Sequence, residues 1–273
     1  MHIGVKLGPG NERALKTHAE NVERMGFHSI WLSERVAVPV DKPHPYPPMA
    51  DPWIGLAFVA AVTERVTLGT SVSQIALRPP MLMARELATI DGLSGGRLIV
   101  GAGAGWVEEE FTSTAIPFAD RGGRLNEFVQ VLRHLWTRPE EAWSGKYYQI
   151  PGTRPIMPLT PGGPPIFIGA SSPTGIRRAA RFGDGFIAVN LAPQVLAGLR
   201  QRLDEMTETF GRPRLPMYAQ AAPPATTDDA TEMVSAYRGA GIEGIILAQP
   251  FSESGNIPSP DVAAALIEAA RSA

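Results

Sequence analysis

Eight short apolar segments recur along the chain and alternate with segments that have the periodicity of amphipathic helices. They lie at His2–Gly8, Ser29–Glu34, Val66–Ile75, Arg97–Gly103, Pro165–Ala170, Gly185–Val189, Leu215–Gln220 and Gly244–Gln249. Most are spaced by roughly 20 to 40 residues, the length of one strand–helix unit. Strict alternation of strand and helix predicts a parallel sheet. Eight such units that close on themselves form a (β/α)8 TIM barrel, and we expect residues 1–273 to form a single barrel domain.

Composition excludes several classes of function. The chain contains no cysteine, which removes disulfides and thiolate chemistry and suits the reducing cytoplasm. The formal net charge is −2, with acidic and basic residues interspersed, so nucleic acid is not an expected partner. Neither a signal peptide nor an apolar run of about 18 residues is evident, which argues against a membrane protein.

A glycine-rich loop follows the fourth predicted strand. Gly95 and Gly96 suit a helix end, and Gly101, Gly103 and Gly105 leave the loop without side chains, so that a flat or phosphorylated ligand can approach the backbone. Loops at the carboxyl ends of barrel strands carry the chemistry of this fold. The spacing is not a clean dinucleotide fingerprint, because no helix follows directly behind it.

Two spacings between strands are longer than the rest. Residues 35–51 are rich in proline and follow the second strand, so we expect them to lie over the mouth of the barrel. Residues 137–164 follow a helix, so we expect most of that segment to run beneath the barrel or around its flank.

Several ordered motifs resemble the luciferase-like monooxygenase family, from about residue 3 to residue 190. They are Ala50–Trp53, Ala60–Thr70, Arg85–Asp91 with the following Leu-Ser-Gly-Gly-Arg, Gly105–Phe111, Arg121–Glu127 and Ile168–Ser172. The resemblance is strongest to the branch that uses the deazaflavin coenzyme F420 in place of FMN. It implies a (β/α)8 barrel, a flavin-type ring across the carboxyl ends of the strands, and a homodimer.

The resemblance also implies a cofactor site. Ser71 and Val72 match the bulge where the family often has a non-prolyl cis peptide behind the ring. Residues Gly103, Ala104, Gly105 and Trp106 would line the ring or its ribityl chain. Residues Gly169, Ala170, Ser171 and Ser172 precede a helix that starts near Pro173, and they would bind the cofactor phosphate. Arg177 and Arg178 could add positive charge one turn later.

Two departures from the family pattern bear on the reaction. The sugar-phosphate dehydrogenase of the family has Asp-His at the end of the second strand, where this chain has Glu34 and Arg35, and a Glu acid where this chain has Trp106. Sugar-phosphate oxidation by that mechanism is therefore not expected here.

The remaining candidates have alternative interpretations. Glu34 can act as a base or accept a hydrogen bond from the ring, or it can form a salt bridge with Arg35 or Arg78. His44 is the histidine placed at the mouth and a candidate for proton transfer. Arg35 can bind an anionic substrate or remain solvated, and Trp53 is expected to contact the substrate.

Other charged residues have structural interpretations. Glu108, Glu109 and Glu110 are typical of the acidic first turn of a helix rather than a metal site, and no metal is expected. Arg121 and Arg124 can form structural ion pairs or contact a phosphate or a cofactor tail. Trp106 can pack against cofactor or substrate, or fill the core.

We therefore expect an F420-dependent oxidoreductase that transfers a hydride between the deazaflavin and a small organic substrate. Two alternatives remain open at this point. One is an FMN-dependent monooxygenase, and the other is a flavin-binding barrel without catalysis.

Overall fold

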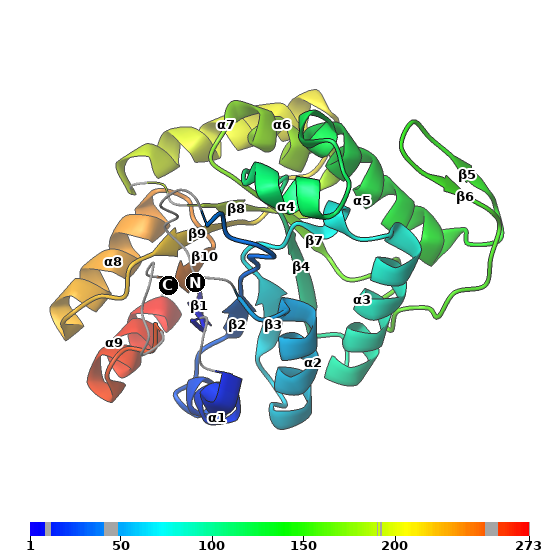
Figure 1. Cartoon of the computed structure of the whole chain (residues 1–273). Helices are drawn as coiled ribbons and strands as arrows, with labels where there is room; N and C mark the ends of the chain where they lie inside the picture. Colours follow the sequence, from blue (N-terminus) through cyan, green and yellow to red (C-terminus); the bar gives the residue numbers. More distant parts are fainter. Residues whose placement is uncertain (9–11, 41–48, 190, 192, 249–255, 273) are drawn as a thin grey trace.

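The fold is a closed barrel of eight parallel strands (Figure 1). The computed structural model describes residues 1–8, 12–40, 49–189, 191, 193–248 and 256–272. Within the barrel, Val5 lies opposite Ile30 on one side and opposite Leu247 on the other, so the first strand closes the ring. The strands are β1 (His2–Lys6), β2 (Ser29–Leu32), β3 (Thr67–Thr70), β4 (Leu98–Ala102), β7 (Ile166–Ala170), β8 (Gly185–Ala188), β9 (Met217–Ala221) and β10 (Gly244–Leu247). The predicted (β/α)8 barrel is confirmed, with each predicted strand in its place.

Helices surround the barrel and cover its outer face (Figure 1). They are α1 (Leu15–Arg24), α2 (Pro52–Val62), α3 (Pro80–Ser94), α4 (Glu108–Ser113), α5 (Arg121–Thr137), α6 (Pro173–Phe182), α7 (Leu196–Thr209), α8 (Thr227–Gly239) and α9 (Pro260–Arg271). In the described part of the chain, no helix combines the length and the apolar character needed to cross a membrane.

The long segment before β7 lies on the flank of the barrel, as predicted. It forms a two-stranded hairpin of β5 (Trp143–Ser144) and β6 (Gln149–Ile150), which Figure 1 shows outside the ring of helices. The buried Glu127 of α5 accepts hydrogen bonds from the backbone amides of Tyr147 and Tyr148 at 3.0 Å each. Further along, Thr160 binds Asp91 near the end of α3, so the segment returns beneath the barrel to β7.

Large side chains from β2 and from the neighbouring strands β7, β8, β9 and β10 fill the barrel interior. Trp31, Phe167, Ile187, Tyr218 and Ile246 form this cluster. Side chains two residues further along the same strands point into the same interior, one layer nearer the carboxyl ends. That next layer is the floor of the cavity described below.

The third predicted strand is shorter than expected. The apolar run from Val66 to Ile75 predicted one strand, but β3 ends at Thr70, and Ile75–Leu77 form a 3-10 turn. The chain leaves the sheet at Ser71, which places the following residues at the mouth of the barrel. Sequence pattern did not show this exit because the residues beyond it are also buried.

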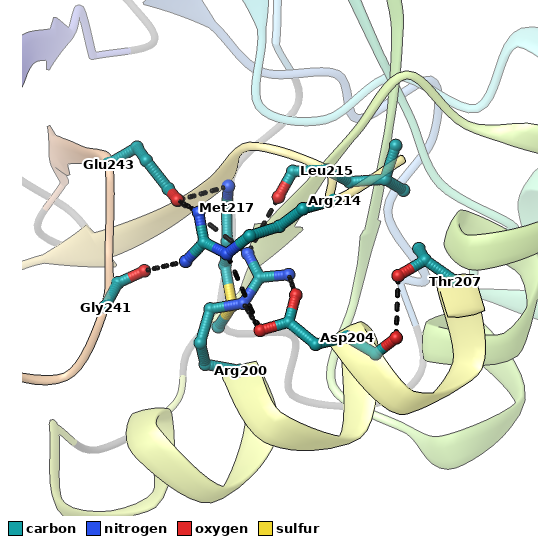
Figure 2. Close-up of polar contacts among 8 residues, drawn as sticks. All are labelled: Arg200, Asp204, Thr207, Arg214, Leu215, Met217, Gly241 and Glu243. Carbon is teal, nitrogen blue, oxygen red and sulfur yellow. Dashed lines mark hydrogen bonds and ion pairs between the residues drawn. The ribbon is translucent and has the colours of Figure 1, made fainter. Parts of the chain in front are cut away.

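A polar network joins α7 to the amino-terminal ends of β9 and β10 (Figure 2). Arg200 is buried, donates to the carbonyl of Leu215 at 2.8 Å and forms an ion pair with Asp204. Glu243 accepts from the backbone amide of Met217 at 2.8 Å and pairs with Arg214. These contacts fix the end of the barrel opposite the cavity.

Candidate functional site

A cavity of about 540 Å³ opens at the carboxyl ends of the strands. Most of the predicted site residues line it: Glu34, Arg35, Ser71, Val72, Gly103, Ala104, Gly105, Trp106, Gly169, Ala170, Ser171 and Ser172. Residues that sequence analysis did not assign to the site also line it, namely Lys6, Ser33, Met49, Gln74, Val189 and Gln220.

One wall of the cavity is the side chain of Val72, which follows a cis peptide between Ser71 and Val72. The expected cis peptide is therefore present. A Cβ on Gly169 would lie 2.3 Å from Val72 Cγ1, and a Cβ on Gly103 would lie 2.7 Å from Val72 Cγ2. The two glycines thus make room for Val72. The glycine-rich loop was predicted to leave space for a ligand, and at Gly103 that space is occupied by the protein itself.

Hydrogen bonds from two other strands hold the Ser71 segment. Gln220 Nε2 donates to the carbonyl of Ser71 at 3.1 Å and contacts its hydroxyl at 2.8 Å. Ser33 Oγ donates to the same carbonyl at 2.9 Å. Because Gln220 lies near the end of β9 and Ser33 follows β2, the Val72 wall is anchored by two separate strands of the barrel.

Glu34 is buried, and both of its carboxylate oxygens have partners. Oε2 accepts from Ser73 Oγ and from the amide of Gln74, each at 2.7 Å. Oε1 forms an ion pair with Arg78 Nη1 at 2.5 Å, and Arg78 also pairs with Asp51 at 2.7 Å. Of the alternatives for Glu34, the salt bridge with Arg78 is the one present.

Arg35 is not a solvated loop residue; it is only 6% exposed and pairs with the fully buried Glu110 at 2.6 Å. Glu110 also accepts from Gln74 Nε2 at 3.0 Å and from the amide of Val36 at 2.8 Å. Burial raises the pKa of Glu110, and the charge of Arg35 opposes that shift. The Arg35 guanidinium lies 5.0 Å from the ring centre of Trp106, which is 55% exposed at the mouth.

The acidic run is the first turn of α4, as predicted. Sequence analysis assigned no specific partner to Glu110, because Arg35 is 75 residues away along the chain. In the described ranges, no group of three metal-ligating side chains occurs.

One described residue of the predicted site does not line the cavity. Trp53 is 3% exposed and packs in the core, so the structure does not place it on the cavity wall where a substrate contact was expected. Its place in the first turn of α2 directs it toward the barrel wall rather than the mouth. His44 lies outside the described residues.

The far end of the cavity suits an anion. Ser171 and Ser172 line it, and Ser172 caps α6 by accepting from the amide of Gly175 at 3.3 Å. Arg178 also lines it, with neutral partners: its Nε donates to Asn126 Oδ1 at 2.7 Å. Burial, and then the charge of Arg121, lower the pKa of Arg178. A cation with neutral partners beside a helix amino terminus is a fitting site for a phosphate.

The other candidate arginines contact aromatic rings rather than the cavity. Arg177 lies 5.9 Å from the ring of Phe210 and does not line the cavity. Arg121 lies 3.9 Å from the ring of Phe118, and Arg124 lies 4.9 Å from the ring of Tyr147. Among the described residues, neither Arg121 nor Arg124 forms the ion pair that was expected.

Lys6 ends β1 and lines the floor of the cavity. Burial lowers its pKa to about 8. A single lysine at the end of an apolar strand carries no local sequence signal, which is why sequence analysis missed it.

Comparisons with known proteins agree with this architecture. The chain matches the family model described as luciferase-like monooxygenase over residues 2–269. It is 32% identical over 220 residues to an F420-dependent glucose-6-phosphate dehydrogenase of Intrasporangium calvum, covering 75% of this chain and 63% of that protein.

Two solved structures share the fold. An F420-dependent secondary alcohol dehydrogenase in complex with an F420–acetone adduct superposes with a TM-score of 0.84 at 17% identity, covering 99% of both chains. A monooxygenase from Streptomyces bottropensis superposes with a TM-score of 0.82 at 21% identity, covering 98% of this chain and 97% of that chain.

The chain belongs to the luciferase-like monooxygenase family. The family resemblance seen in the motifs is therefore confirmed.

Proposed function

We propose that this protein is an F420-dependent oxidoreductase that transfers a hydride between the deazaflavin and a small organic substrate. The observation that carries the proposal is a single cavity that joins the Val72 wall to the anion site at Arg178. A flat ring with a phosphorylated side chain needs both features. The relative from Intrasporangium calvum and the alcohol dehydrogenase structure, both described as F420-dependent, support the choice of cofactor.

Different residues of the cavity would bind the ring and the phosphate of the cofactor. Val72 would support one face of the ring, with Gly103 and Gly169 on either side. The amides after Ser171 and the Arg178 guanidinium would hold the phosphate. The bound deazaflavin supplies hydride chemistry at its C5 carbon. Trp106 would cover the mouth on the substrate side.

A titration of the protein with F420 and with FMN, followed by tryptophan and cofactor fluorescence, tests the proposal. We expect micromolar binding of F420 and at least tenfold weaker binding of FMN, a difference of about 1.4 kcal/mol. Arg178→Met should weaken F420 binding at least tenfold. Arg177→Met on the same helix is the matched control and should bind normally, because its guanidinium faces Phe210. Unchanged affinity in the Arg178 variant would remove the anion site from the proposal.

A second candidate is an FMN-dependent monooxygenase, which the monooxygenase structure and the family description favour. Tighter binding of FMN, oxygen uptake and the absorbance of a flavin–oxygen adduct would support it. Tight cofactor binding without turnover on any substrate would support a non-catalytic flavin-binding barrel.

We also propose that the protein is a cytoplasmic homodimer. Ile54 and Phe58 of α2 are 74% and 46% exposed, and Leu82 of the adjacent α3 is 44% exposed. Light scattering on the wild type and on an Ile54→Glu variant tests the dimer. We expect the substitution to produce a monomer.

A further inference from the structure

The described part of the cavity wall contains few side chains that can exchange a proton. Its titratable residues are Lys6, Glu34, Arg35 and Arg178. Arginine does not release its proton in proteins. Both oxygens of Glu34 are engaged by Ser73, Gln74 and Arg78, so its carboxylate is already committed to protein partners.

Lys6 differs from Glu34 and Arg35, which also face the cavity. Glu34 is neutralised by Arg78, and Arg35 is neutralised by Glu110. Burial alone accounts for the shifted pKa of Lys6, with no contribution from a carboxylate in the described residues. The value of about 8 lies in the range where a lysine can both donate and accept a proton at neutral pH.

The position of Lys6 suits a role in chemistry. It occupies the interior layer of the barrel floor, which also holds Ser33 and Gln220, the residues that anchor the Val72 wall. A ring supported by Val72 would therefore share this floor with Lys6.

We propose that Lys6 is the catalytic acid and base of the reaction and that the substrate is a carbonyl compound or the corresponding alcohol. This inference rests on the proposed F420 dependence. In reduction, the carbonyl carbon receives a hydride, with its two electrons, from the reduced deazaflavin. The N–H bond of the Lys6 ammonium breaks as an O–H bond forms on the carbonyl oxygen. The neutral amine then takes a proton from water, and the reverse reaction runs these steps backwards.

The first test measures the ionisation of Lys6 without any substrate. Pulsed acetylation with acetic anhydride from pH 6 to 11, read by mass spectrometry, reports the reactive fraction of each lysine. We expect a midpoint near pH 8 for Lys6, below the ordinary lysine value of about 10.4. A midpoint at the ordinary value would overturn the proposal. Lys16 is exposed on α1 and serves as the control for accessibility. Bound F420 should slow the acetylation of Lys6 and leave that of Lys16 unchanged.

The second test follows single turnovers of reduced F420 with a panel of aliphatic ketones and aldehydes. Lys6→Met and Lys6→Arg should each lower the rate of hydride transfer at least 100-fold, with F420 affinity changed less than threefold. Lys16→Met is the control and should behave as the wild type. The wild-type reduction rate should fall as pH rises through about 8, because the ammonium form is lost, and the residual rate of Lys6→Arg should not change there.

The outcomes separate this inference from the proposed function. Absence of F420 binding to the wild type would defeat the proposed function. Binding of F420 with no reduction of any carbonyl would show that the substrate class is wrong. A Lys6 variant that keeps the wild-type rate and pH profile, or that loses only cofactor affinity, would show that Lys6 is not the catalytic acid.

Discussion

Charged side chains at the rim of the cavity are matched in pairs, and the partners come from distant parts of the chain. Asp51, Arg78 and Glu34 form one group of ion pairs, and Arg35 and Glu110 form a second ion pair. Gln74 connects the two groups, because its backbone amide donates to Glu34 and its side-chain amide donates to Glu110. The rim is therefore a fixed polar framework in which each side chain depends on the others.

The buried ion pair of Arg35 and Glu110 gives the first prediction about single residues. Glu110→Gln leaves the Arg35 charge buried without its carboxylate and should lower the free energy of unfolding by about 3–5 kcal/mol. Urea denaturation measures this change. Glu108→Gln, which removes an exposed carboxylate from the same turn, should change stability by less than about 0.5 kcal/mol. Equal stability of the two variants would contradict the assigned role of Glu110.

The Val72 wall gives a second prediction. Gly169→Ala places a Cβ 2.3 Å from Val72 Cγ1, and relieving this overlap should cost about 1–3 kcal/mol of stability and weaken cofactor binding. Adding Val72→Ala should recover most of the lost stability, because it removes the atoms in conflict. The control is Gly92→Ala in α3, where a Cβ meets nothing within 4 Å and helix propensity favours alanine. Thermal denaturation of the four proteins completes the comparison, and a double variant no more stable than Gly169→Ala would refute the assigned packing.

One end of the barrel forms the cavity and the other end holds a structural polar network. The carboxyl ends of β3, β4 and β7 lead into the Val72 wall and the anion site, whereas the amino ends of β9 and β10 join the network of Arg200. Stability and binding are therefore separable at opposite ends of the barrel.

Arg200 and Arg214 test this separation. Arg200→Met removes a buried guanidinium, leaves the Leu215 carbonyl without its donor and should cost about 1–3 kcal/mol. Arg214 is 52% exposed, so Arg214→Met should cost less than about 1 kcal/mol. Neither variant should change cofactor affinity, measured by fluorescence titration, because the network lies at the opposite end of the barrel. A large loss of affinity in Arg200→Met would contradict that expectation.

Elements were predictable from sequence where the information is local. Short apolar segments that alternate with helical segments located all eight strands. The glycine at the end of α3 was also predictable, because Gly95 adopts the left-handed conformation with φ of 67°. Contacts between distant residues were not predictable. Val72 fills the space at Gly103, and Glu110 forms an ion pair with Arg35. Trp53 faces the core. Each of these results depends on how neighbouring strand–helix units pack. Lys6 was missed for the same reason.

At the scale of the whole molecule, a pair of half-buried histidines lies at the amino-terminal end of the barrel. His2 and His28 have ring centres 5.1 Å apart, and His2 is also 5.1 Å from the ring of Tyr218. Burial, the charge of His28 and the charge of the N-terminus lower the pKa of His2 to about 3. Burial also lowers the pKa of His28. Both rings therefore remain neutral in the folded protein at pH values where they are charged in the unfolded chain.

Acid should consequently destabilise the protein. The stability that the neutral rings provide is complete above the ordinary histidine pKa of about 6.5 and is lost as the pH falls toward about 3. His2 alone should account for at most about 2 kcal/mol of loss at pH 5. Urea denaturation between pH 8 and pH 5 measures this loss, and His2→Phe should reduce the dependence. An equally steep decline in that variant would assign the acid sensitivity to other groups.

The way Val72 is enclosed also bears on how this barrel can be altered by evolution or by design. Its side chain lies between Gly103, which follows β4, and Gly169 of β7, so most single substitutions at any of the three positions create a gap or an overlap. The side chain of Trp106 is 55% exposed and is not enclosed in this way. Libraries directed at Trp106 and Met49 should therefore yield many folded variants with altered selectivity. Substitutions of Val72, Gly103 or Gly169 should give folded protein only when two of these positions change together.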